Sequence, residues 1–177
     1  MSLLQQLKTR KSKSFALKLA MEAANDKEVF KQLARLACSG KAESLRASWA
    51  LGFACEMNPE GFRKIESDVL QALAMTQVHP GIIRNLLRIF LVLPPSNEHE
   101  GRVFNEAFRI FFDHSYPVAA RAYALSICTN MLVKYPEMSN ELRIMADFIN
   151  PDHGPALNVV ARRLKQKLAK IDNLRKV

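Results

Sequence analysis

The sequence lacks any apolar stretch close to the roughly 18 to 20 residues that a membrane-spanning helix needs. Residues 1–15 also lack an uninterrupted apolar segment of signal-peptide length, so we expect a soluble, cytoplasmic protein that does not insert into membranes. Glycine is scarce, with six among 177 residues, which argues against an all-β fold because such folds use glycine in turns. Hydrophobic residues make up 49% of the chain, which is enough for a continuous core and argues against native disorder.

Sequence motifs for catalysis are missing as well. There is no Gly-x-Ser-x-Gly turn, no glycine-rich phosphate loop and no HExxH helix. The three cysteines, Cys38, Cys55 and Cys128, are far apart and form no CxxC pair, which favours small core residues in a reducing compartment. We therefore predict no enzymatic activity, no catalytic residue, no metal ligand and no cofactor.

Positive charge is concentrated at the two ends of the sequence. The chain carries a net +9, of which residues 1–18 contribute +5 and residues 158–177 contribute +6, leaving −2 between them. Such clusters are usually solvated ends that favour solubility, and a dedicated site for a polyanion is the alternative.

The sequence repeats itself with a period of 37 residues, and each unit contains two apolar helical frames. The first frame places apolar residues at four recurring positions: Leu45, Ile82, Ala119 and Ala156; Trp49, Leu86, Tyr123 and Val160; Ala50, Leu87, Ala124 and Ala161; and Phe53, Phe90, Ile127 and Leu164. The second frame contains Leu33, Leu70, Ala107 and Ile144, and also Ala37, Ala74, Phe111 and Phe148. Two frames per unit predict two helices per unit.

Prolines and turn residues agree with this period. Pro80 and Pro117 are 37 residues apart, and Gly154-Pro155 follows at the next interval, where proline suits a first helical position. The pattern predicts helices over residues 12–24, 27–39, 43–57, 60–77, 80–93, 98–113, 117–135, 137–149 and 155–172.

The repeat also gives the histidines and the single tryptophan a structural interpretation. His79 and His153 are two repeats apart, and His99 and His114 bracket one predicted helix, so each pair should be on the order of 20 Å apart, too far for shared zinc ligation. His79, Tyr116 and His153 are interpreted as residues that close turns between repeats.

Trp49 falls on the core stripe and is predicted to be a core anchor, with stacking on a ligand as the alternative. Gly52, in the same predicted helix, is ascribed to a close helix crossing, with a ligand pressed against the backbone as the alternative.

Helix pairs that repeat every 37 to 40 residues resemble HEAT/armadillo-like repeats, and LRASWALGFACEMNPE (45–60) is similar to a first HEAT helix and its turn. RASWALGFACE, NEAFRIFF, VAARAYALS and ARRLKQKL resemble small bacterial, Bacteroidetes-type helical-repeat proteins. The resemblance implies an all-α, right-handed α-α superhelix, here as one domain over residues 1–177. We expect repeat units at 12–41, 42–78, 79–115 and 116–152 and a capping helix at 153–172.

If the second helix of each unit lines a concave side, as in HEAT-like arrays, its polar residues form a recognition surface for a protein or peptide. The candidate binding residues are Lys31, Arg35, Arg102, Asn105, Arg109 and Arg143. Their mixed surroundings of acidic and basic residues favour a non-enzymatic scaffold. The alternative is a nucleic-acid binder similar to HEAT-like DNA glycosylases, in which Arg35, Arg63, Arg102, Arg109 and Arg143 follow a phosphate backbone.

Overall fold

The computed structural model describes residues 2–9 and 12–174, and every regular element in that part of the chain is helical. In chain order the elements are α1 Leu3–Thr9, α2 Lys13–Asn25, α3 Lys27–Ala37, α4 Ser44–Met57, α5 Pro59–Leu73, α6 Pro80–Val92, α7 Glu100–Phe112, α8 Val118–Met131, η1 Pro136–Met138, α9 Ser139–Phe148, η2 Pro151–His153 and α10 Pro155–Leu174. The helices from α2 to α10 lie on the predicted ranges to within a few residues, and the all-α helical-repeat class is confirmed.

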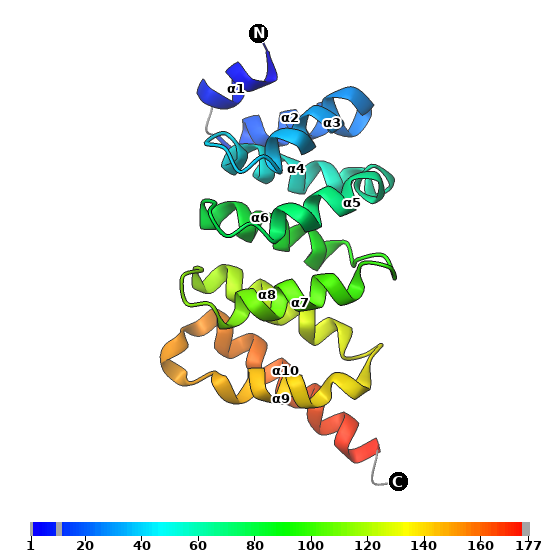
Figure 1. Cartoon of the computed structure of the whole chain (residues 1–177), viewed down its shortest axis with the longest axis vertical. Coiled ribbons are helices and arrows are strands. Elements are labelled where there is room, and N and C mark those ends of the chain that lie inside the picture. The colour runs from blue at the N-terminus through cyan, green and yellow to red at the C-terminus, as the bar shows by residue number, and fades with distance from the viewer. Residues whose placement is uncertain (1, 10–11, 175–177) are drawn as a thin grey trace. The chain divides into compact units, whose positions relative to one another are not determined.

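Contacts between residues divide the chain into two compact units, Met1–Val103 and Phe104–Val177. In the first unit α2 pairs with α3 and α4 with α5, and α4 also packs against α2 and α6 (Figure 1). In the second unit α8, α9 and α10 pack on one another. Helix α7 begins in the first unit and continues in the second. The single domain over residues 1–177 and its repeat boundaries remain predictions.

The first helix of each hairpin has a stripe of buried residues. Counted from the first residue of the stripe, they lie at positions 0, 3, 4 and 7, and among them only Tyr123 and Val160 are partly exposed. The buried residues of these stripes are Ala16, Leu19, Ala20 and Ala23 in α2; Ala47, Ala50, Leu51 and Ala54 in α4; Ile83, Leu86, Leu87 and Phe90 in α6; Ala120, Ala124 and Ile127 in α8; and Leu157, Ala161 and Leu164 in α10. The predicted row that starts at Ala50 is buried in every copy.

The predicted row that starts at Leu45 is wrong in its last two copies, although Ile82 is buried. Ala119 and Ala156 are exposed, because the buried stripe begins one residue later in each of their helices. The α2 stripe also precedes the α4 stripe by 31 residues instead of 37. This shorter first interval explains why a shift of 37 aligns polar Ser12 and Lys13 with the core of α4.

The second helices follow the same 0, 3, 4, 7 pattern, with Glu106 and Ile149 only partly buried, but their register changes in α9. The stripes begin at Phe30, Glu66, Val103 and Leu142, so the last interval is the longest. The extra residues lie at the end of α8, because the connections 93–99 and 132–138 before α7 and α9 have the same length. The predicted core position Ile144 is therefore wrong: its side chain is 60% exposed. Ala74 is also exposed, because α5 ends at Leu73.

Turn residues begin the helices where the sequence predicts. Asp26 accepts hydrogen bonds from the amides of Glu28 and Val29 at the start of α3, and Asn58 accepts one from Gly61 at the start of α5. Such N-caps satisfy backbone donors that have no partner within the helix.

Helix α1 is a feature that sequence analysis missed, because residues 1–18 were interpreted as a solvated basic end. Leu7 is 1% exposed, and Arg46 of α4 donates hydrogen bonds to the carbonyls of Leu7 (2.6 Å) and Lys8 (3.2 Å). The Lys8 ammonium also lies 3.6 Å from Glu43. One buried leucine and one arginine at the carbonyl end of the helix thus hold α1 in place.

The connection after α6 is held by a buried carboxylate. Glu66, 2% exposed in α5, accepts a hydrogen bond from the amide of Ser96 (2.7 Å) and forms an ion pair with Arg63 (3.0 Å). Arg63 in turn donates to the carbonyl of Pro94 (2.9 Å). A charged residue is thus accommodated at a core position of the repeat, because its oxygens have partners.

Gly52 does not mark a close helix crossing, which corrects the sequence interpretation. A Cβ atom added there would lie 3.5 Å from Nη1 of Arg88 and 4.0 Å from Cγ1 of Ile89, which are ordinary contact distances. At Gly81, by contrast, an added Cβ would lie 2.7 Å from Cδ1 of Leu45.

Replacing Leu70 by alanine should lower the free energy of unfolding by about 2 to 5 kcal/mol, because its fully buried side chain would leave a cavity. The matched change Ile144→Ala should cost no more than about 0.5 kcal/mol, because that side chain faces water. Urea denaturation followed by circular dichroism measures both. Equal losses would refute the register assigned to α9.

Gly52→Ala should raise the free energy of unfolding by about 1 kcal/mol, since alanine favours the helix and has room. Gly81→Ala should be destabilising, because Leu45 must move. A loss of stability in the Gly52 variant, measured in the same urea titration, would show that α4 and α6 approach more closely than described.

Candidate functional site

A cleft of about 310 Å³ lies between the first turns of the two second helices α3 and α5. Phe30 and Ile65, which are 3% and 6% exposed, give it an apolar floor. The remaining lining residues are polar or small: Lys27, Lys31, Asn58, Glu60, Gly61 and Lys64.

The two helix starts are brought together by their caps. Asn58 accepts from the amide of Gly61 with its side-chain oxygen (2.8 Å), and its side-chain nitrogen donates to the carbonyl of Ala24 (3.1 Å), which ties the start of α5 to α2. Asp26, two residues after Ala24, caps α3 with its carboxylate. The positive end of the α3 dipole therefore already has an anion beside it, whereas α5 is capped by the neutral amide of Asn58 and favours a negatively charged group at the cleft.

Three lysines line the cleft and give it its charge. Lys27, Lys31 and Lys64 are all exposed, and Glu60 is the acidic residue among the lining side chains. Lys31 lies 2.9 Å from Glu28, but both side chains are largely exposed, so this pair is weak and a ligand carboxylate can compete for the lysine.

Arg35 extends this positive charge along α3. Lys27, Lys31 and Arg35 follow at intervals of four residues, so they share one face of the helix, which we name the α3 basic row. Sequence analysis identified Lys31 and Arg35 and missed Lys27 and Lys64. The signal was available, since Lys27 and Lys64 are one 37-residue period apart.

The other predicted binding residues lie on α7 and α9. Arg102 and Asn105 are exposed on α7. Arg109 is held within its own unit: it lies 2.9 Å from Glu106 and donates to the hydroxyl of Tyr116 (3.5 Å). Partial burial lowers the pKa of Arg109, but its bonds to Tyr116 and Glu106 outweigh this and raise it.

Arg143 forms an ion pair with Asp172 of α10. Arg63, Arg109 and Arg143, three of the five arginines considered for a phosphate backbone, are thus engaged in intramolecular bonds, while Arg35 and Arg102 are exposed.

The turn-closing role predicted for His79, Tyr116 and His153 is confirmed. Nδ1 of His79 accepts from the amide of Gly81 at the start of α6 (3.0 Å), and Nδ1 of His153 accepts from the amide of Asn150 (3.1 Å). Tyr116 is 7% exposed in the turn before α8.

Sequence analysis missed the proximity of His114 to His153, whose ring centroids are 6.0 Å apart beside Phe148. Within the described part of the chain, no three histidine, cysteine, aspartate or glutamate residues gather to hold a metal ion.

The cysteines behave as core residues. Burial raises the pKa of the Cys38 thiol to about 12, with a further contribution from Asp68. Burial also raises the pKa values of Cys55 and Cys128. These thiols are protonated near neutral pH, so they are poor nucleophiles.

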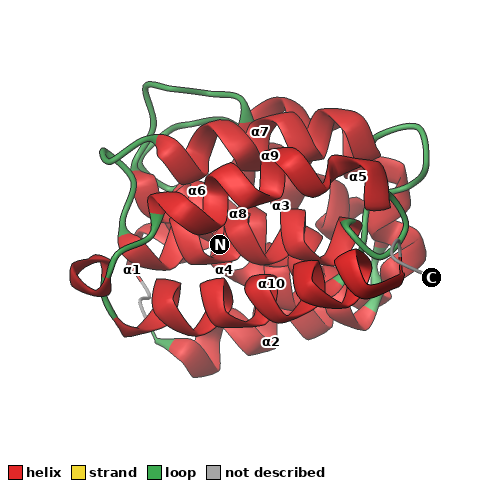
Figure 2. Cartoon of the chain, turned by 90° about the horizontal axis from the view of Figure 1, so that it is seen from below, coloured by secondary structure: helices red, strands yellow, loops and turns green. Residues whose placement is uncertain are grey.

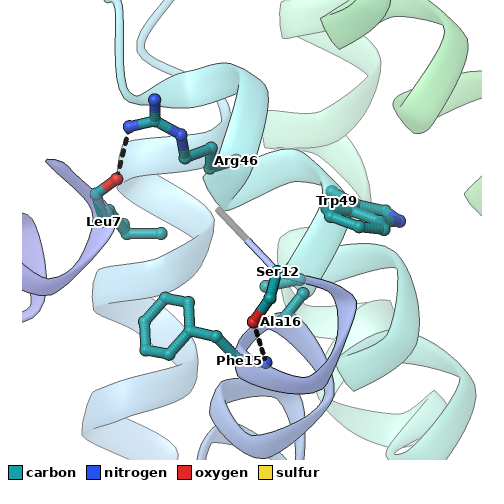
Figure 3. A pocket seen from close by; sticks show the side chains of 7 residues that line it. Leu7, Ser12, Phe15, Ala16, Arg46 and Trp49 are labelled. Carbon is teal, nitrogen blue, oxygen red and sulfur yellow. Dashed lines mark hydrogen bonds between the residues drawn. The ribbon is translucent and has the colours of Figure 1, made fainter. Parts of the chain in front are cut away.

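Trp49, predicted to be a core anchor, is partly buried, so part of its side chain stays at the surface. Its ring lies 6.3 Å from that of Phe53. It also borders a pocket with Leu7, Phe15 and Arg46 (Figure 3). That pocket has a volume of about 10 Å³, which is room for about one water molecule and not for a stacked ligand.

Similarity to known proteins agrees with this geometry. A family model described as HEAT repeat domain matches residues 3–168. The chain belongs to the HEAT repeat family. No curated protein and no solved structure matches this HEAT repeat protein, and the narrower resemblance to small bacterial proteins remains a prediction. None of its described helices combines the length and the apolar character needed to cross a membrane.

The raised pKa predicts slow alkylation of Cys38 in the folded protein. Its rate with iodoacetamide at pH 7.4 should be at least about a hundredfold below that of free cysteine, whose pKa is near 8.5. The rate should keep rising above pH 9.5, because more thiolate forms as the pH approaches 12. Peptide mapping by mass spectrometry gives the site-specific rate, and urea-unfolded protein is the control. A plateau near pH 9 in folded protein would contradict this environment.

Proposed function

We propose that this protein is a non-enzymatic HEAT repeat scaffold that binds a peptide segment of a partner protein in the cleft between α3 and α5. The bound segment carries a carboxylate next to an apolar side chain. The apolar side chain covers Phe30 and Ile65, and the carboxylate meets Lys31 and Lys64.

The observation that carries this proposal is the combination of an apolar floor with a rim of lysines in one cleft. Apolar contact provides affinity, and a few convergent polar groups provide orientation. The N-terminus of α5, whose cap Asn58 is neutral, reinforces the preference for a carboxylate over a cationic side chain. HEAT repeats typically mediate protein interactions, which supports a peptide over a small metabolite.

The predicted residues outside the cleft are proposed separately for each unit. In the first unit Arg35 continues the α3 basic row beyond the cleft, and Arg102 is exposed on α7. In the second unit Asn105 is exposed on the same helix. Arg109 instead pairs with Glu106 of its own helix and donates to Tyr116, while Arg143 ties α9 to α10 through Asp172. We propose that this binding takes place in the cytoplasm.

Peptides selected from a random phage-displayed library on the wild-type protein should contain an acidic residue beside an apolar one. Lys31→Glu combined with Lys64→Glu should weaken the best peptide at least tenfold in isothermal titration calorimetry, because both changes place negative charge at the rim. Replacing the acidic residue of the peptide by its amide should have a similar effect.

The matched control is Lys13→Glu with Lys18→Glu, two exposed positions of α2 that do not line the cleft and carry the same change in charge. This variant should bind within threefold of wild type. Equal loss in both variants, or selected peptides without acidic residues, would show that the cleft is not the site.

A further inference from the structure

A second surface lies in the unit Phe104–Val177, along one side of α10. A groove of about 580 Å³ runs there beside the connection between α9 and α10. Its lining residues are Ile149, Asn150, Asn158, Ala161, Arg162, Lys165, Gln166 and Ala169.

The pattern of α10 explains why this side is open. The helix is 20 residues long and continuous (Figure 2). Leu157, Ala161, Leu164 and Leu168 form its buried stripe, and the described helices that contact it most are α8 and α9. Arg162, Lys165 and Ala169 follow at intervals of three and four residues, so they form an adjacent, exposed stripe on the same helix.

The exposed stripe lies in a strongly positive region. Arg162, Arg163, Lys165 and Lys170 are exposed, and none of them forms an ion pair with another described residue. The one acidic residue of α10, Asp172, pairs with Arg143 of α9. The positive charge of α10 is therefore not neutralised within this unit, and it attracts negatively charged partners.

The floor of the groove is aliphatic, which distinguishes between kinds of acidic partner. Ile149, Ala161 and Ala169 contribute apolar surface between the charged side chains. A nucleic-acid backbone would use the cations and leave this floor uncovered, whereas an amphipathic helix covers both. A second copy of this chain would bring another protein of net charge +9 to the same surface, which is unfavourable.

We infer that the groove on α10 is a docking site for an acidic amphipathic helix of another protein. Its apolar residues pack on Ile149 and Ala169, and its carboxylates pair with Arg162 and Lys165. This surface shares no residue with the cleft between α3 and α5.

The test uses a fluorescein-labelled peptide of about 20 residues. Its leucines recur at intervals of three and four residues, so that they form one helical stripe, and glutamates occupy the opposite face. Fluorescence anisotropy is measured with the Lys31→Glu, Lys64→Glu variant, because the cleft between α3 and α5 is proposed to accept an acidic residue beside an apolar one. It should show binding of the peptide to this variant. A peptide of the same composition with its leucines scrambled should bind at least tenfold more weakly, and so should polyglutamate, because neither presents an apolar stripe.

Two double variants of equal charge change locate the site. Arg162→Glu with Lys165→Glu should weaken the helical peptide at least tenfold, because both residues line the groove. Arg163→Glu with Lys170→Glu, exposed on the same helix but outside the groove lining, should weaken it less than threefold. Circular dichroism checks folding, and R162Q with K165Q makes the same comparison if charge reversal unfolds the helix.

Several outcomes would overturn the inference. One is an equal loss of affinity for the helical peptide in the two double variants of α10, and another is equal affinity for the helical and the scrambled peptide. A third is that duplex DNA binds more tightly than the helical peptide and that both double variants weaken DNA binding to the same extent. All of these titrations use the Lys31→Glu, Lys64→Glu background, in which the cleft does not bind acidic segments, so failure of the cleft proposal and failure of this one are distinguishable.

Discussion

The burial of an apolar stripe on each helix is the constraint on which the rest of the structure depends. Helix α4 carries it furthest, since it packs against α2, α3 and α6 and buries Ser48 and Cys55 beside a stripe made largely of alanine. Small side chains let neighbouring helices approach closely, and their summed contacts supply the stability that short isolated helices lack. Buried polar groups are accommodated by partners: Asn85 of α6 donates to the hydroxyl of Ser48 in α4 at 3.0 Å.

The fold was predictable because the burial stripe is periodic in the sequence. A repeat of apolar residues, with prolines and capping residues between its copies, identifies helices from α2 to α10 and their family class. The errors occur where the interval between stripes changes. Between α2 and α4 it is shorter than 37 residues, and before α9 it is longer, so Ile144 was assigned to the core although it faces water. Helix α1 was not predicted, because the two residues that anchor it, Leu7 and Arg46, are distant in sequence.

The candidate cleft was only partly predictable for a different reason. Lys31 and Arg35 are recognisable as polar residues on a second helix, but a cleft requires knowledge of which side chains from α3 and α5 meet. Lys64 and Ile65 join the site through the packing of two hairpins, and this depends on the Asn58 cap and its bond to Ala24. The roles of Arg109 and Arg143 also depend on such contacts, because a sequence does not show whether a guanidinium already has a carboxylate beside it.

The changed interval before α9 has a consequence for how such chains diversify. The additional residues lengthen the end of α8, since the connection 132–138 that contains the 3₁₀ turn Pro136–Met138 is no longer than the connection 93–99 before α7. Helix α9 still presents Leu142, Met145 and Ala146 to its neighbours. Helix length and interior packing are thereby decoupled in this hairpin. Insertions and deletions can accumulate at helix ends during evolution while the hydrophobic interior keeps its composition.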